Sequence, residues 1–245
     1  KEGCKEVWLT STDNGCYGLD IGTDLPTLVN AVSEIQEDFM IRVGMMNPMY
    51  MPRIKQKLIE SYDNDKVFKF LHLPVQSGSD KVLNDMKRGH TSETFREIVK
   101  RTKDRFDDFT ISTDIIVGFP SETEEDFQKT LTLLDETKPD VVNLSKYSAR
   151  PGTDAAELKQ IDAAEIKRRS KIIFEQINKI SLESNKKWIG WKGKVLFDEN
   201  TEEGIKGRNY AYKPIAVQEK VSIGDSHVVE ITDATRKRLI GKIAS

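Results

Sequence analysis

Length, composition and charge describe a folded protein with a highly charged surface. The 245 residues suffice for one large domain, or for a large and a small one. Hydrophobic residues make up 37% and charged residues 32%, nothing resembles a signal peptide, and no apolar run approaches the length of a membrane span. Two cysteines make no disulfide framework, so we expect a reducing, cytoplasmic setting and no membrane partner.

Strand and helix patterns alternate through the first two thirds of the chain. Strands are expected at residues 6–10, 39–46, 67–75, 110–117 and 141–147, and helices at 25–38, 54–62, 81–86, 92–105 and 124–137. Five strand candidates in this alternation predict an α/β fold with a parallel sheet covered by helices.

After Pro151–Gly152 the pattern changes. Residues 163–187 predict one long helix, and from Lys194 short alternating segments follow, separated by Gly, Asn and Asp. Such segments are typical of a small antiparallel barrel. We therefore expect two domains, at residues 1–189 and 190–245, with the boundary near Gly190.

The charge is unevenly divided between the two predicted domains. The net charge is −2, but residues 186–245 carry 12 Lys and Arg against 8 Asp and Glu, whereas residues 1–185 carry 26 against 32. A basic terminal module on an acidic body favours an anionic partner such as nucleic acid. A solvated surface explains so small an excess almost as well.

Three of the predicted strands end in polar or glycine-rich motifs. They are FLHLPVQSGSD (Phe70–Asp80), TDIIVGFPSET (Thr113–Thr123) and VNLSKYSARPGT (Val142–Thr153). Parallel α/β barrels build their active sites at the carboxyl ends of the strands. We therefore expect the three motifs to line one cavity.

Several polar residues in these segments are candidates for binding, each with a structural alternative. Gln76 can donate and accept hydrogen bonds at once, whereas Ser79 or Asp80 could simply cap the next helix. Asp114 lies in an apolar strand, so it either binds a ligand or anchors a hydrogen-bond network. The loop Ser11–Gly18 could hold a ligand's amino or carboxylate group, or be an Asn-Gly turn.

Cysteine and histidine spacing indicates no metal site. Cys4 and Cys16 match no zinc or iron–sulfur spacing, and the three histidines lack metal-ligand spacing with one another and with the cysteines. In the terminal module, basic and aromatic residues interleave between Lys194 and Lys213, a pattern that binds RNA by charge and stacking or fills a small core.

Taken in order, the strings at 3–26, 41–48, 71–91, 112–130 and 148–153 resemble the radical S-adenosylmethionine (SAM) methylthiotransferases. The nearest subgroup is archaeal and eukaryotic and acts on N6-threonylcarbamoyladenosine (t6A) at tRNA position 37. The resemblance implies a partial parallel (β/α)6 barrel lacking its first strand, followed by a small antiparallel TRAM domain. It also implies SAM as cofactor and tRNA as partner.

In an intact member of this family, one SAM supplies a methyl group to sulfur, and another yields the radical that activates C2 of the adenine. Two [4Fe–4S] clusters take part, and neither of the family's cysteine sets is present in this sequence. We therefore expect an N-terminally truncated fragment that is inactive by itself.

The motif match also implies site residues. Those expected at SAM are Ser11, Thr12, Asp13, Arg42, Gln76, Ser77, Arg88 and Asp114, with Arg42 or Arg88 pairing with the SAM carboxylate. Tyr147 and Arg150 are expected nearer the substrate. Lys206, Arg208 and Lys213 are candidates for tRNA phosphates.

Two rival interpretations remain. One is a methylthiotransferase for another substrate, either isopentenyladenosine in tRNA or an aspartate of a ribosomal protein. The other is an RNA-binding protein with a degenerate, non-catalytic barrel.

Overall fold

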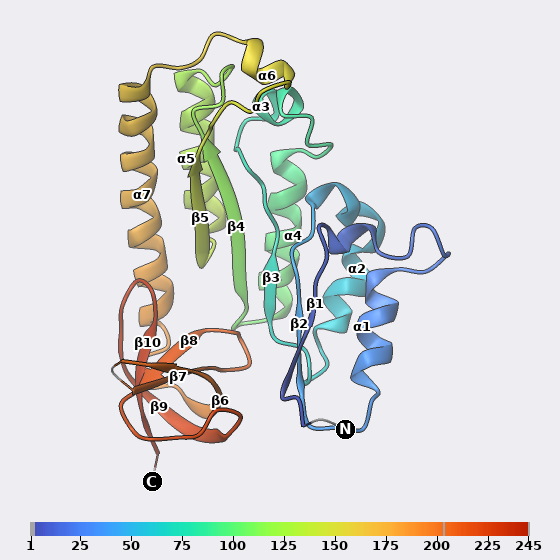
Figure 1. The fold of residues 1–245 in the computed structure, drawn as a ribbon, viewed down its shortest axis with the longest axis vertical. Helices are drawn as coiled ribbons and strands as arrows, with labels where there is room; N and C mark the ends of the chain where they lie inside the picture. Colours follow the sequence, from blue (N-terminus) through green and yellow to red (C-terminus); the bar gives the residue numbers. More distant parts are fainter. Residues whose placement is uncertain (1–2, 203, 245) are drawn as a thin grey trace.

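The computed structural model describes residues 3–202 and 204–244, which form an α/β part followed by a ring of strands (Figure 1). The α/β part contains five parallel strands, β1 (Glu6–Leu9), β2 (Met40–Val43), β3 (Phe70–His72), β4 (Thr110–Val117) and β5 (Val141–Lys146). β1 pairs with β2, and β4 lies between β3 and β5. A parallel bridge between Ile41 and Val67 joins the two groups, so the strands follow one another in chain order.

Helices cover one face of these strands. They are α1 (Leu25–Ser33), α2 (Met51–Ser61), α3 (Asp80–Asp85), α4 (Ser92–Arg105), α5 (Glu124–Thr137) and α7 (Ala163–Lys186), with short turns η1 (Asn14–Cys16) and η2 (Pro48–Tyr50). The short helix α6 (Asp154–Glu157) has no buried residue. Successive strand residues point to opposite faces, so Ile111, Ile115 and Val117 of β4 enter the main apolar core. Ser112, Asp114 and Ile116 take the opposite side, called here the open face.

The C-terminal part is a closed ring of five strands. These are β6 (Lys192–Thr201), β7 (Gly204–Arg208), β8 (Pro214–Val217), β9 (Ser226–Ala234) and β10 (Leu239–Ile243), paired in the order β10-β8-β7-β6-β9. The ring encloses a second apolar core that includes Val195, Phe197, Ile215 and Val229.

The ring lies against the ends at which the parallel strands begin (Figure 1). The ring of Tyr212 packs at 4.8 Å from that of Phe68 and at 5.1 Å from that of Phe70. The side-chain amide of Asn185, at the end of α7, donates to the carbonyl of Thr235 at 2.8 Å. Aromatic packing and polar contacts therefore both join the two parts.

Most of the expected elements are present. The strand at 110–117 and the helices at 92–105 and 124–137 have the predicted bounds. The expected boundary at Gly190 falls in the short segment between α7 and β6. Among the described residues, no helix is both long and apolar enough to span a membrane.

Two expectations about the architecture need correction. The terminal ring is not wholly antiparallel, because β8 and β10 pair in parallel. It also contains β7, a strand that the sequence did not suggest because Ile205 is its one large apolar residue.

Strands β1 and β5 are the outer strands of an open sheet in the part of the chain that is described.

Candidate functional site

A cavity of about 840 Å³ lies on the open face, at the carboxyl ends of β3, β4 and β5. Side chains from all three strand-end motifs line it, which confirms that the motifs form one cavity. The polar and aromatic residues among them are His72, Gln76, Arg88, Asp114, Phe119, Asn143, Ser145, Lys146, Tyr147, Ser148, Arg150 and Thr153.

Asp114 is the centre of a hydrogen-bond network in this cavity. Its Oδ1 lies 2.9 Å from Nε2 of His72 and accepts a hydrogen bond of 2.8 Å from the side-chain amide of Asn143. Burial by itself would raise the pKa of Asp114, but these two contacts and the nearby charge of Arg88 together outweigh it and lower the pKa. Three neighbouring strands thus hold an ionised carboxylate in a fixed orientation.

Gln76 and Arg88 bring unpaired polar atoms to the same cavity. Oε1 of Gln76 and Nε of Arg88 are buried without a hydrogen-bond partner among the described residues. Buried polar atoms are almost always paired, so this orphaned acceptor and orphaned donor are available to a ligand in the cavity. Burial lowers the pKa of Arg88 while Asp114 opposes the shift, and an arginine remains charged at neutral pH.

The backbone of Gln76 is also strained. Its φ of 72° lies in the left-handed region, which costs a residue with a Cβ atom about 1–3 kcal/mol. Backbone contacts hold it there, because the Gln76 N–H donates to the carbonyl of Asp114 and its own carbonyl accepts from Ile116. Such strain is concentrated at functional sites, where the surrounding structure over-determines the conformation.

The residues that follow Gln76 fasten this loop to α5. Ser77 is fully buried, with Oγ 3.4 Å from Oγ1 of Thr130, and the Gly78 N–H donates to the same hydroxyl at 2.9 Å. A Cβ atom at Gly78 would lie 2.4 Å from the carbonyl oxygen of Lys129, so glycine is required for this approach. The structure therefore places Ser77 behind the cavity wall, although it was expected at SAM.

Helix capping differs from the sequence-based alternatives in its details. Ser79 occupies the cap position of α3 but makes no side-chain cap bond there, and its hydroxyl donates instead to Asp126 at 2.6 Å. Asp80 accepts from the Ser92 N–H at the start of α4. Both side chains connect neighbouring helices.

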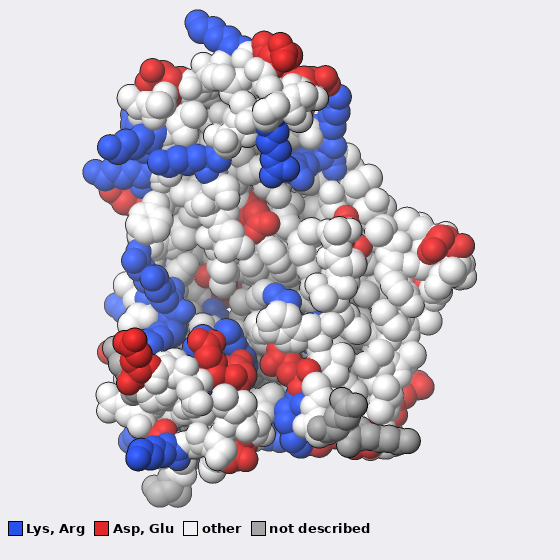
Figure 2. All heavy atoms as spheres, in the orientation of Figure 1, with Lys and Arg blue, Asp and Glu red and all other residues white. Residues whose placement is uncertain are grey.

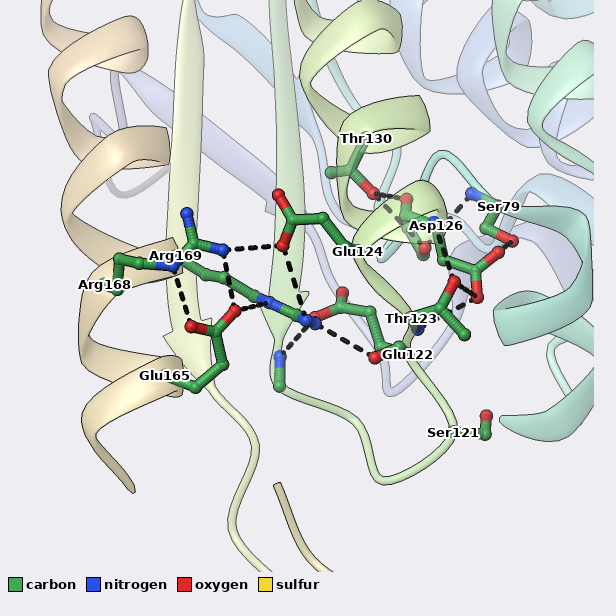
Figure 3. Close-up of polar contacts among 12 residues, drawn as sticks. Ser79, Ser121, Glu122, Thr123, Glu124, Asp126, Thr130, Glu165, Arg168 and Arg169 are labelled. Atoms are coloured by element: carbon green, nitrogen blue, oxygen red, sulfur yellow. Dashed lines mark hydrogen bonds and ion pairs between the residues drawn. The ribbon is translucent and has the colours of Figure 1, made fainter. Parts of the chain in front are cut away.

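The turn after β4 is held by a buried ion pair with α7 (Figure 3). Oε2 of Glu122 accepts hydrogen bonds from the Gly118 N–H at 3.0 Å and from Arg169 at 2.8 Å. Burial raises the pKa of Glu122, and the Arg169 guanidinium opposes this shift. Thr123 and Asp126 then form a capping box that starts α5.

This turn places an aromatic pair on the cavity wall. The rings of Phe119 and Tyr147 meet edge to face, with centroids 5.2 Å apart. Both residues line the cavity, and aromatic faces of this kind stack on nucleic acid bases. Arg150 lies farther along the segment that leaves β5 and also lines the cavity.

Three candidates from the first loop lie outside the cavity lining. Oδ1 of Asp13 accepts from the N–H groups of Gly15 at 2.9 Å and Asn47 at 3.1 Å, and the hydroxyl of Ser11 accepts from the Asp13 N–H. Asp13 thus ties the loops after β1 and β2 together. Ser11, Thr12 and Asp13 are all absent from the lining of the cavity.

Arg42 lies among aromatic rings near the C-terminal ring. Its guanidinium carbon is 4.7 Å from the ring centre of Trp8, 5.0 Å from that of Phe70 and 5.2 Å from that of Tyr212. These contacts are cation–π interactions. Of the two arginines considered for the SAM carboxylate, the structure places Arg88 in the cavity.

The three basic residues expected to bind tRNA phosphates all have carboxylate partners. Lys206 pairs with Glu199 at 2.5 Å and Arg208 with Asp198 at 3.3 Å. Lys213 is buried, and its ammonium lies 2.8 Å from Oδ1 of Asp140. A phosphate contact does not fit this placement of Lys213, because its ammonium is almost fully buried and already paired with Asp140.

Sequence reasoning missed His72 and Phe119 as cavity residues. The sequence showed only that His72 lacks metal-ligand spacing, yet it shares the open face of β3 with Phe70 just as Asp114 shares that of β4 with Ser112. Alternate residues of a strand share one face, and the parallel register pairs His72 with Ser112. Asp114 is the next residue of β4 on that face, so His72 and Asp114 are diagonal neighbours. Phe119 gave no such signal, because it lies in a turn.

Comparison with known proteins identifies the family of the chain. The family model of the radical SAM superfamily matches residues 1–134. A probable threonylcarbamoyladenosine tRNA methylthiotransferase of Archaeoglobus fulgidus is 46% identical over 100% of this chain and 58% of its own length. Proteins of the same description from Pyrococcus abyssi and Methanocaldococcus jannaschii are 43% and 45% identical, over 100% and 99% of this chain. The chain spans 58% and 56% of these two relatives.

Proposed function

The chain belongs to the radical SAM superfamily, and from this premise we propose that it is part of a tRNA methylthiotransferase. The reaction is addition of a methylthio group to C2 of t6A at position 37 of tRNA. The observation that carries the proposal is similarity over the whole chain, at 43–46% identity, to relatives described as t6A tRNA methylthiotransferases. The cavity supplies the second line of support, because its chemistry suits SAM.

The residues present fit the amino acid end of SAM. The guanidinium of Arg88, with its unpaired Nε, would hold the SAM carboxylate, and the unpaired Oε1 of Gln76 would accept from an ammonium or hydroxyl group. In the whole enzyme, one SAM would supply the methyl group, and a second, after one-electron reduction by an iron–sulfur cluster that this chain does not hold, would supply the radical that activates C2. The protein's own residues bind and orient the reactants and keep water away.

Asp114 and the aromatic pair would orient the rest of the reactants. The Asp114 carboxylate is held ionised by His72 and Asn143, so it can accept hydrogen bonds from ribose hydroxyls or an ammonium group. Phe119 and Tyr147 offer apolar ring faces at the same wall. Arg150 and Tyr147 remain our candidates for the substrate side of the cavity.

An iron–sulfur cluster does not fit the residues of this chain. The sequence contains two cysteines, whereas clusters of this kind are held by three or four thiolates. Among the described residues, no three His, Cys, Asp or Glu side chains are grouped to hold a metal. We therefore derive no step through a cluster and expect this chain, by itself, to lack methylthiotransferase activity.

Nucleoside analysis of tRNA from a strain without the gene tests the proposed function. We expect 2-methylthio-t6A to disappear, t6A to accumulate, and the complete gene to restore the modification. Unchanged 2-methylthio-t6A would overturn the proposal. Loss of methylthiolated isopentenyladenosine, or of the modification on a ribosomal protein, would identify the first rival, and no change in any of them would favour the non-catalytic rival.

A further inference from the structure

A second concave surface lies on the other side of β5 from the cavity. It is a groove of about 520 Å³ between β5 and α7, lined by Val142, Leu144, Lys146, Lys167, Ser170, Lys171, Phe174 and Ile177. The alternation of β5 explains its position, because Val142, Leu144 and Lys146 point toward α7. Asn143, Ser145 and Tyr147 point into the cavity. Lys146 lines both concave surfaces.

The lysines of this groove have little neutralising charge around them. No carboxylate lies within ion-pair distance of Lys146 or Lys167 in the part of the chain that is described, and Lys171 is 3.9 Å from Glu175. All three lysines are exposed. By contrast, most exposed lysines on α2, α3 and α4, such as Lys57 and Lys100, pair with Asp or Glu. The groove is therefore a site of unbalanced positive charge.

Basic residues continue from the groove toward the C-terminal ring. The guanidinium carbon of Arg236, between β9 and β10, lies 5.3 Å from the ring centre of Phe174, and Nη1 of Arg236 donates to Oδ1 of Asn178 in α7 at 2.8 Å. Phe174 itself is 48% exposed. Figure 2 shows Lys and Arg side chains gathered along the edge of the molecule that α7 forms.

We propose that the groove between β5 and α7 binds the sugar–phosphate backbone of the tRNA that enters the cavity. This inference rests on the proposed function for the identity of the RNA. A polyanion matches three lysines on one surface, and the exposed Phe174 ring offers a stacking face for a base or ribose. Because the groove and the cavity share β5, a strand held in the groove lies one strand's width from the reacting nucleotide.

The competing occupant is a protein strand that pairs with the free edge of β5. The lysines count against it, since charged side chains on an edge strand oppose such pairing. The apolar residues Val142 and Leu144 are partly buried and share the groove with three lysines. The charge of the groove therefore favours RNA.

Binding of a transcribed tRNA to the 245-residue chain tests this inference. The variant Lys146→Ala/Lys167→Ala/Lys171→Ala is compared with Lys57→Ala/Lys100→Ala/Lys129→Ala, which removes the same charge from exposed lysines of α2, α4 and α5. A third variant, Lys167→Ala/Lys171→Ala, leaves the cavity residue Lys146 in place. Circular dichroism confirms that each variant is folded.

We expect the groove variants to lose at least tenfold in tRNA affinity and the control to keep most of it. Three phosphate contacts change the salt dependence, so between 50 and 200 mM salt the unsubstituted chain should lose about 20- to 40-fold more affinity than the groove triple variant. Equal affinity and equal salt dependence of the two triple variants would overturn the inference and leave the groove to another partner.

The outcome is separable from that of the proposed function. If the groove variants lose tRNA affinity while the gene-deletion strain keeps 2-methylthio-t6A, the groove is an RNA site and the proposed reaction is wrong. If the deletion strain loses the modification while the groove variants bind tRNA like the control, the reaction stands and the groove inference fails.

Discussion

The Lys213 ammonium donates a hydrogen bond of 2.8 Å to Oδ1 of Asp140, and this buried contact joins the C-terminal ring to the start of β5. Ser184 at 3.1 Å and Asn185 at 3.2 Å, both in α7, complete the environment of the ammonium. Burial by itself would raise the pKa of Asp140, but the charge and hydrogen bond of Lys213, together with hydrogen bonds from Ser184 and the Ile111 N–H, outweigh it and lower the pKa. A residue that the sequence suggested for RNA binding therefore connects the two parts of the molecule.

Removing this cation should destabilise the protein strongly. In Lys213→Met the Asp140 carboxylate stays buried without its partner, and breaking a buried pair in this way costs about 3–5 kcal/mol. Urea unfolding measures the loss. The exposed Lys220→Met is the control, with a change in the free energy of unfolding within about 0.5 kcal/mol. A loss below about 1 kcal/mol for Lys213→Met would contradict the structural role.

The pair of Asp140 and Lys213 also determines part of how the stability of the fold depends on acid pH. Because the folded pKa of Asp140 is lower than its ordinary value of 3.8, the pair stabilises the fold fully at neutral pH. Its contribution is lost as the pH falls through the folded pKa, below 3.8. The Lys213→Met variant should lack this part of the acid transition.

Glu122 should give the opposite dependence on pH. Burial raises its folded pKa above the ordinary 4.5, so the folded state is less favourable at high pH and gains stability as the pH falls through that pKa. Arg169→Met removes the charge that opposes this shift, so the pKa should rise further and the gain on acidification from pH 8 to pH 5 should increase.

Urea unfolding across this pH range tests the pair. The double variant Glu122→Gln/Arg169→Met has no titrating carboxylate at this position and should lose the extra pH dependence. If Arg169→Met and the unsubstituted protein gain the same stability on acidification, the contact between Arg169 and Glu122 drawn in Figure 3 does not shift the pKa of Glu122.

Arg88 should contribute most of the electrostatic attraction for the SAM carboxylate. A hydrogen bond to a charged group contributes about 1.5–3 kcal/mol, so Arg88→Met should weaken SAM binding by about 10- to 150-fold. Isothermal titration of the chain with SAM measures this. Arg96→Met, on the far side of the sheet in α4, should bind SAM like the unsubstituted chain, and equal affinities for all three would exclude Arg88 from the site.

Gln76 should show a trade-off between stability and binding. Glycine adopts a φ of 72° without strain, so Gln76→Gly relieves backbone strain in the folded state. This gain offsets the stability lost because glycine increases the conformational entropy of the unfolded chain. The free energy of unfolding of Gln76→Gly should therefore not fall, while its SAM affinity should drop about tenfold with the loss of Oε1. A variant that is less stable by more than about 1 kcal/mol, or that binds SAM normally, would contradict this account.

Local sequence signals account for the elements that were predicted well. Helix α5 begins where Thr123 and Asp126 satisfy each other's backbone N–H groups, and α4 begins where Thr91 caps the Thr94 N–H. Such contacts span three residues, so the sequence reveals them directly. The shorter extent of β3 and the existence of β7 depend on which strand lies alongside, and neither has a local signal.

The sequence by itself determined the alternation of strands and helices, the three motifs at the strand ends and the resemblance to radical SAM methylthiotransferases. It could not determine which polar residues meet. His72 and Asp114 are 42 positions apart and Asp140 and Lys213 are 73 apart, and the fold brings each pair together. A lysine has the same intrinsic chemistry at Lys171 as at Lys213. Only the tertiary structure leaves the first in solvent beside a groove and buries the second against a carboxylate, because burial and partner decide whether its charge can reach another molecule.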